Sequence, residues 1–275
     1  MPALPPAKIK RLPLTGAKLA APLDISQPGM PAADSIHAVV KFKAKYRILK
    51  STEVDSYEQT PTAVALKKAL TGKQPSAAAV AKAMKGPAVV SDNFAGTARK
   101  AAKLSIADGL AKTSKDLSGL IASLVPDDKM VHHQPKIGIG AKSGRVAEEK
   151  RNVRVLAFLY AASREADNDF HLIIGGDPQK TPETYMTMEL SALPPANSPS
   201  FQKLNAARKA FKDFFGDHLP NATYDFYTPP IPVTIKGSLF FDMSHGKGAR
   251  PGPASLKSRM PTIWEVHPIT SIKLG

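Results

Sequence analysis

The C-terminal half of the chain has a pattern of apolar and polar positions that predicts five strands and one helix. Segment 151–162 is apolar on both faces, and segments 169–175, 184–190, 231–243 and 262–274 place apolar residues at alternate positions, as strands with a buried face do. Segment 198–216 repeats apolar residues every three or four positions, which predicts an amphipathic helix ending at Gly216. The predicted fold class is therefore α+β, in the order strand, strand, strand, helix, strand, strand.

This order of elements is that of the OB-fold, a five-stranded, partly open Greek-key barrel. The helix between the third and fourth strands would plug one end of the barrel. Gly237 lies in the middle of the fourth strand, where a barrel strand must bend sharply. We expect residues 151–275 to form an OB-like barrel, and a β-sandwich with an attached helical domain is the competing fold.

The first 150 residues divide into three parts. Residues 1–34 are rich in Pro and Ala and predict a tail or extended arm. Residues 35–60 contain a long basic strand at 36–48, with apolar residues at even positions and cations at odd ones. Residues 61–150 read as a helical segment and a loop, which would be an insertion beside the barrel. A long amphipathic helix is predicted at 94–124, and Gly96, Gly109 and Gly119 could break it.

The C-terminal part also resembles a set of uncharacterised bacterial proteins. The resemblance rests on DNDFHLII (167–174), TYMTMEL (184–190), GSLFFDMSH (237–245) and WEVHPI (264–269), and covers about 125 residues. It implies an OB-like barrel and carries no activity with it.

Composition narrows the function classes. The 275 residues contain no Cys, which excludes disulfides, thiolate metal sites and a cysteine nucleophile. No apolar run approaches the length of a membrane-spanning helix, and the first residues have no apolar core of a secretory signal. These features favour the cytoplasm, or export by a route that needs no such signal.

The charge is strongly positive and uneven. The chain has 38 Lys and Arg against 23 Asp and Glu, and 12 of the 15 excess positive charges fall in the first 150 residues. Such a balance favours an acidic partner, nucleic acid first, although a solvated lysine-rich surface explains it equally well. The basic helix at 94–124 could lie on an anionic membrane, but it has one Phe and no Trp, so membrane binding is not expected.

Two basic stretches are candidates for binding a polyanion. The predicted strand would carry a row of cations about 6.6 Å apart, and the loop at 244–261 between the last two strands is basic and contains no acid. Both could equally be ordinary solvated surface. The candidate nucleic-acid-binding residues are Lys41, Lys43, Lys45, Arg47, Lys247, Arg250, Lys257 and Arg259.

A third candidate is a group of His and acidic residues near the ends of the predicted strands. Imidazole and carboxylate ligands suit zinc, manganese or iron, and a paired His and carboxylate can serve as an acid and a base. Each His could also be structural, since no compact metal motif, nucleophile elbow or phosphate loop is present. The candidate metal ligands are His171, His245, His267, Glu265 and Asp242.

These observations favour a non-enzymatic module that holds an anionic polymer on a basic surface and needs no cofactor. The alternatives are a phosphodiester hydrolase assisted by a divalent metal, and an interaction protein whose tail docks on a protein partner.

Overall fold

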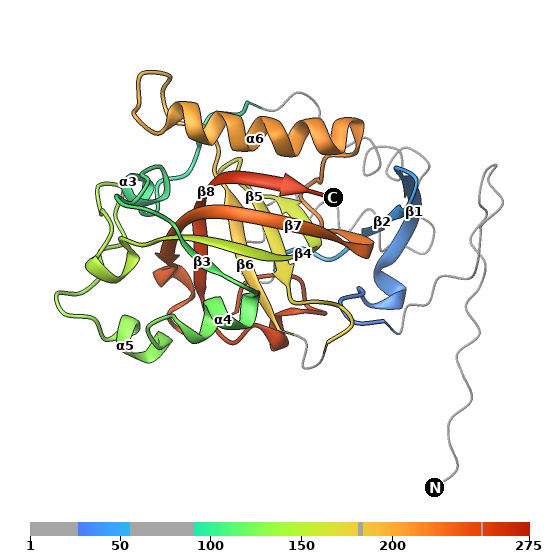
Figure 1. Ribbon diagram of the computed structural model, residues 1–275, viewed down its shortest axis with the longest axis horizontal. Helices are drawn as coiled ribbons and strands as arrows, with labels where there is room; N and C mark the ends of the chain where they lie inside the picture. Colours follow the sequence, from blue (N-terminus) through green and yellow to red (C-terminus); the bar gives the residue numbers. More distant parts are fainter. Residues whose placement is uncertain (1–26, 56–90, 181–183, 249) are drawn as a thin grey trace, which may run out of the picture.

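The computed structural model describes residues 27–55, 91–180, 184–248 and 250–275. This part of the chain is α+β, and most of its residues in regular secondary structure belong to eight strands (Figure 1). The strands are β1 (Ile36–Phe42), β2 (Tyr46–Ser51), β3 (Lys112–Ser114), β4 (Asn152–Arg164), β5 (Phe170–Gly175), β6 (Tyr185–Leu190), β7 (Asp225–Phe241) and β8 (Trp264–Leu274). The helices are α3 (Lys100–Lys103), α4 (Leu117–Ala122), α5 (Asp127–Val131) and α6 (Phe201–Phe215). Short 3-10 turns are η1 (Ala33–Ser35), η2 (Ala147–Glu149), η3 (Gly216–His218), η4 (Met243–His245) and η5 (Lys257–Arg259).

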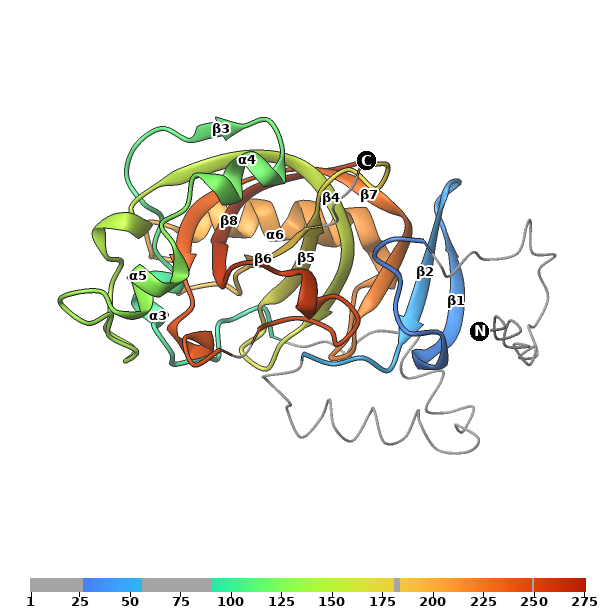
Figure 2. The same cartoon turned by 90° about the horizontal axis from the view of Figure 1, so that it is seen from below.

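Strands β4 to β8 form a ring of pairings. The sheet order is β1-β2-β7-β8-β6-β5-β4-β3, and β7 also pairs with β4, which joins the two ends of the five-stranded part. All neighbours in the ring are antiparallel except β6 and β8, which run parallel and meet at Met188 and Val266. Figure 2 looks into this ring and shows α6 behind it.

The main hydrophobic core lies inside the ring. The inward positions predicted for the second and third strands of the C-terminal half are confirmed: Phe170 and Leu172 of β5 and Met186 and Met188 of β6 are all buried there. Helix α6 contributes an apolar face to the same core and packs mainly on β8. As predicted, this helix ends at Gly216, which has a positive φ of 54°.

A close approach between strands explains Gly237. An added Cβ at this position would collide with the carbonyl oxygen of Pro268 and the side chain of Val266. The pairing of β7 with β8 changes register on both sides of the glycine. The bend predicted at Gly237 is therefore a local irregularity in the pairing of β7 with β8. Here the backbone of β8 lies too close to β7 for any side chain to fit.

The single basic strand predicted at 36–48 is wrong, because the segment is a hairpin. Strands β1 and β2 pair with Lys41 opposite Arg47, and Lys43 and Lys45 lie in the turn between them. Lys43 adopts a positive φ of 51°. The four cations therefore do not form a row along one strand. Strand β2 pairs in turn with β7, so the hairpin extends the sheet beyond the ring.

The long helix predicted at 94–124 is also wrong. Helix α3 covers four residues, and Arg99, just before it, has a left-handed φ of 45°. Leu110, an apolar residue within the predicted helix, is 98 % exposed. A new helix, α4, starts where Asp116 accepts a hydrogen bond from the backbone of Gly119. The first part of the predicted helical segment, residues 61–90, lies outside the described residues, as does most of the predicted tail. No helix in the described ranges is long and apolar enough to cross a membrane.

One buried ion pair ties the hairpin to the ring. The Lys50 Nζ lies 2.6 Å from Oδ2 of Asp225, and both side chains are almost fully buried. The two residues are also direct partners in the pairing of β2 with β7. Burial raises the pKa of Asp225 to about 6, even though Lys50 opposes this shift.

Removing one partner of this pair leaves an uncompensated buried charge. We expect Lys50→Met to lower the free energy of unfolding by about 3–5 kcal/mol. The double variant Lys50→Met/Asp225→Val should recover most of that loss, because both charges are then gone. Urea denaturation of Lys50→Met and of the double variant measures both free energies of unfolding. A double variant that is as unstable as Lys50→Met, or less stable, would contradict this expectation.

The same pair predicts a pH dependence. The pKa of Asp225 is about 6 in the folded chain and about 3.9 in an unfolded one. The folded state therefore holds a proton that the unfolded state has lost, and stability falls as pH rises through 6. Between pH 4.5 and 7.5 the wild type should lose about 2 kcal/mol relative to the double variant. Urea denaturation at both pH values measures this difference, and parallel pH profiles would contradict it.

Candidate metal centre

The outer face of β5, β6 and β8 carries polar residues that are nevertheless buried. Because side chains alternate along a strand, the residues between the inward apolar positions point away from the ring. On β5 the first such residue is His171, on β6 they include Thr187 and Glu189, and on β8 they are Glu265 and His267. All five are at most 3 % exposed.

The strand register brings these side chains together. His171 is directly opposite Glu189 in the pairing of β5 with β6. On β8, Glu265 and His267 flank Val266, which is the partner of Met188. Two side-chain contacts cross from β6 to β8 as a result: Thr187 donates to Glu265 at 3.2 Å, and Glu189 lies 2.9 Å from Nδ1 of His267.

Neighbouring segments add further acids and one more histidine. Four overlapping groups of three residues each place their ligand atoms within 4.8 Å of one another, and together they contain six carboxylates and three imidazoles. We call this set the His–carboxylate cluster. Its members are Asp55, Glu165, Asp169, His171, Glu189, Asp242, His245, Glu265 and His267.

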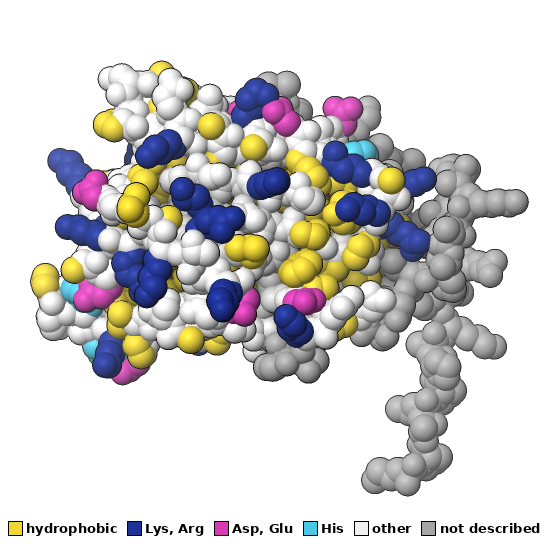
Figure 3. Space-filling model, in the orientation of Figure 1, with side chains coloured by type: hydrophobic (Ala, Val, Ile, Leu, Met, Phe, Trp, Pro, Cys, Tyr) yellow, Lys and Arg dark blue, Asp and Glu magenta, His cyan; other side chains and the backbone are white. Residues whose placement is uncertain are grey.

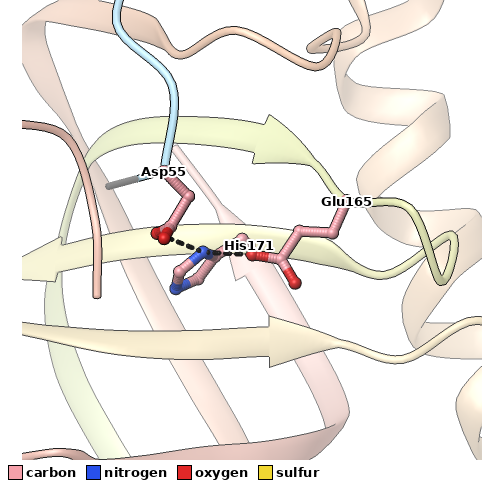
Figure 4. Close-up of side chains that lie close together, drawn as sticks. All are labelled: Asp55, Glu165 and His171. Carbon is pink, nitrogen blue, oxygen red and sulfur yellow. Dashed lines mark ion pairs between the residues drawn. The ribbon is translucent and has the colours of Figure 1, made fainter. Parts of the chain in front are cut away.

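One ring nitrogen of His171 contacts three partners. Its Nδ1 lies 2.6 Å from Glu165, 3.0 Å from the Tyr224 hydroxyl and 3.6 Å from Asp55 (Figure 4). Burial would lower the pKa of His171, but the charges of Glu165 and Asp55 raise it well above its ordinary value. The other ring nitrogen, Nε2, is buried and has no hydrogen-bond partner among the described residues.

Glu189 sits between His267 and a buried lysine. The Lys103 Nζ lies 3.9 Å from Glu189 and 3.4 Å from Asp167. Burial would raise the pKa of Glu189, but His267 and Lys103 hold it well below its ordinary value. On its other side, His267 faces Asp169 at 3.4 Å. One cationic side chain thus reaches into a group of carboxylates.

Asp242 and His245 approach from the end of β7. The 3-10 turn η4 brings Nε2 of His245 to 3.4 Å from Asp242, which also accepts the backbone N–H of Ser244. The ligand atoms of both residues lie within 4.8 Å of Glu265. Burial, followed by the charges of Glu189 and Asp242, raises the pKa of Glu265 well above its ordinary value.

A second buried ion pair positions this end of β7. Arg99 makes two contacts with Glu149, at 2.6 and 2.8 Å. Arg99 also donates to the carbonyl of Phe241, and Glu149 accepts the backbone N–H of the same residue. Both backbone groups of the residue before Asp242 are therefore fixed, and α3, which carries Lys103, begins directly after Arg99.

The donor set fits a divalent transition metal. A ring nitrogen of His171 and the carboxylates of Glu189 and Glu265 form one of the four groups, and Asp242 and His245 share Glu265 with it. One imidazole with carboxylates suits zinc, manganese or iron(II) better than calcium or magnesium, which prefer oxygen alone. Glu165 on Nδ1 supplies the outer contact that usually orients a metal-binding imidazole.

A loop between β7 and β8 covers the cluster. We call residues 246–262 the cover loop. The backbone N–H of Gly252 donates to Asp55 at 2.6 Å, and the backbone and hydroxyl of Ser255 both donate to Glu53. Near its end, Thr262 donates to Asp127, which also pairs with Arg250 at 2.8 Å. Leu256 and Met260 of the loop pack with Tyr160, Ile173 and Tyr185 in a second apolar cluster.

The structure brings the predicted metal ligands together but places the predicted polyanion-binding residues in two separate regions. The five candidate ligands predicted from the sequence all belong to the cluster. The candidate polyanion residues are split between the turn and strands of the hairpin and the cover loop, where Lys247, Lys257 and Arg259 lie in or beside η4 and η5.

Four members of the cluster were not among the predicted ligands. Glu189 could have been found, because it stands at an outward position of a strand whose inward residues are methionine and leucine. Asp169 alternates with His171 and gave a similar signal. Asp55 and Glu165 follow no strand pattern, and only the tertiary structure brings them to His171.

Comparison of the chain with protein-family models, with curated proteins and with solved structures finds no match. The geometry of the cluster is therefore the basis for assigning a function.

The anchoring role of Asp127 predicts a local effect. We expect Asp127→Ala to speed amide hydrogen exchange in residues 250–262 about tenfold, because charged hydrogen bonds to Thr262, Ile263 and Arg250 are lost. Mass spectrometry of peptides from this region measures the exchange. Asp128→Ala is the matched control, since its side chain is 88 % exposed. Equal rates in both variants would contradict the assignment.

Proposed function

We propose that this protein is a hydrolase of phosphodiesters that uses a divalent transition metal bound in the His–carboxylate cluster. The observation that carries the proposal is the close approach of the His171 imidazole to the carboxylates of Glu189 and Glu265. A buried imidazole nitrogen without a partner is costly, and a metal ion would satisfy it together with the surrounding acids.

Charge balance supports a bound cation. The cluster contains six carboxylates, whereas Lys103 is the lysine that reaches it among the described residues. Closely spaced buried carboxylates repel one another unless protons or cations intervene. A divalent ion would neutralise two of these charges at once.

The mixed ligand set favours catalysis over a purely structural role. Structural zinc sites are usually closed by four Cys or His ligands, whereas catalytic sites combine His with carboxylates and leave a position open. The ion would act as a Lewis acid on a water molecule and on a phosphoryl oxygen. His245, oriented by Asp242, would take a proton from that water. The water oxygen forms a bond to phosphorus as the ester bond breaks, and His245 returns the proton to the leaving oxygen.

A phosphodiester is favoured as substrate by the charge of the cover loop. The loop between β7 and β8 contains Lys247, Arg250, Lys257 and Arg259 and no acid. These cations would attract an anionic substrate to a segment that covers the cluster. The anchors at Glu53, Asp55 and Asp127 would hold the loop closed between turnovers.

The OB-like assignment belongs to this proposal as well. The pairing circuit of β4 to β8, the parallel contact of β6 with β8 and the position of α6 between β6 and β7 support it. In such a barrel the loop between the last two strands flanks the ligand face. The cover loop and the cluster would then occupy the usual place for a binding site.

Metal binding is tested first. We expect the protein, stripped with chelator and reloaded with Zn²⁺ or Mn²⁺, to retain about one ion per chain by elemental analysis. His171→Gln and Glu265→Gln should each weaken binding at least about 100-fold, because each removes a ligand. His132→Gln is the control, since His132, directly after α5, is 75 % exposed.

A milder variant keeps the metal site testable if the ligand variants fail to fold. Glu165→Gln leaves all three proposed ligands in place and should weaken binding 10–100-fold through the orientation of His171. Thermal melting of each variant without metal separates a folding defect from a binding defect. Wild-type protein that retains no ion, or equal losses in His132→Gln and His171→Gln, would refute the metal centre.

Hydrolysis is tested with bis(p-nitrophenyl) phosphate. We expect release of p-nitrophenol that depends on added metal and is lost in His171→Gln. His245→Ala should keep the ion and lose most of the rate, since general acid–base catalysis contributes about 10²–10⁴-fold. A loaded protein without activity on this probe or on a DNA oligonucleotide would refute the hydrolase while leaving the metal site.

A further inference from the structure

An open basic surface lies on a part of the ring that the metal centre does not use. The outward positions of β4, β7 and β8, where these strands pair beyond Gly237, include Arg154, Lys236 and Lys273. Their inward neighbours Val155 and Ile235 fill the core, which fixes the outward direction of the basic side chains. Lys236 and Lys273 are exposed, and Arg154 is half-buried.

The register sets these cations side by side. Arg154 is the direct partner of Lys236, and Lys236 is the partner of Ser271 on β8. Lys273 is the next outward residue after Ser271. Like charges directly opposite each other on a sheet repel, so this arrangement is unfavourable unless an anion lies across it. Among the described residues no ion pair joins any of the three to an acid.

The face is free of acids as well as rich in cations. The other outward residues here are Leu156, Phe158, Pro232, Thr234 and Ser271, all uncharged. In Figure 3, Lys and Arg side chains lie over β7 and β8 in the middle of the view, and no acidic side chain is visible over them.

A hollow continues the basic face at the beginning of β4. It has a volume of about 930 Å³ and is lined by Lys100, Lys142 and Lys203, with Asp108 as its one acidic residue. Asn152 also lines it and shares an outward face with Arg154, two residues farther along the strand. Outward neighbours on a strand are about 6.6 Å apart, so the hollow and the face form one surface.

We propose that this surface, which we call the basic tract, binds the sugar–phosphate backbone of nucleic acid. The tract comprises Lys100, Lys142, Arg154, Lys203, Lys236 and Lys273. A chain of phosphates matches cations that extend from the hollow across three strands, whereas a small anion would contact only a few of them. The tract itself consists of Lys and Arg, whose contacts with phosphates carry no sequence information, so binding is independent of sequence. It differs from the hairpin and loop predicted from the sequence, and it does not depend on the metal centre.

The test is fluorescence anisotropy with a fluorescein-labelled 30-base-pair DNA duplex in EDTA, over a range of salt concentrations. We expect Arg154→Gln/Lys236→Gln/Lys273→Gln to bind at least about tenfold more weakly and to lower the slope of log K against log salt by about 2–3. Lys100→Gln/Lys142→Gln/Lys203→Gln should behave in the same way.

The matched control is Lys129→Gln/Lys136→Gln/Lys180→Gln, which removes the same net charge from exposed lysines on other parts of the surface. It should retain wild-type affinity and slope. Equal losses in all three variants would mean that only net charge matters, and would overturn the proposal. An unchanged tract variant, or binding to phosphatidylserine vesicles without binding to the duplex, would overturn it as well.

Discussion

The structure depends on keeping a set of charged side chains out of water. Strands β5, β6 and β8 are apolar on their inner face and carry histidines and carboxylates on their outer face, and both faces are buried. A strand with one apolar face would normally leave the other to solvent. Here the cover loop, the segment after β2 and the segment around α3 close over the polar face. The anchors of the cover loop are themselves carboxylates, so acids hold the loop over other acids.

Two buried ion pairs hold the segments that lead to the cluster. Arg99 and Glu149 fix the backbone at the end of β7, from which Asp242 and His245 reach the cluster. Lys50 and Asp225 join the hairpin to the start of the same strand, and the chain after the hairpin brings Asp55 to His171. Breaking either pair would leave a buried charge and would also release a segment that contributes to the centre.

The sequence predicted the regular part of this arrangement well and the irregular part poorly. Alternation identified β5, β6 and β8, and unexpected polar residues within or beside strands identified His171, Glu265 and His267. The same reasoning missed Glu189, because that strand was characterised by its methionines. Residues 94–124 read as a helix because Ala and Lys favour one, but Arg99 turns toward Glu149 and Asp116 starts a new element. Long-range contacts of single side chains override propensity there, and no local pattern encodes them. The hairpin was misread because a turn of Lys, Ala and Lys lacks the usual turn residues.

The pairing of β6 with β8 and the ion pair of Lys50 with Asp225 have a kinetic consequence. Lys50 and Asp225 are 175 residues apart in the sequence, and Thr187 and Glu265 are 78 apart. Contacts of such large sequence separation require loops to close before any energy is gained, and chains rich in them fold slowly. The ligand atoms converge only when β8 joins the ring, so an ion could not be captured at full affinity by a partly folded chain. Occupancy of the centre would then report completed folding, and a long-lived intermediate without β8 would expose the carboxylates of this edge together with the apolar core residues that β8 covers.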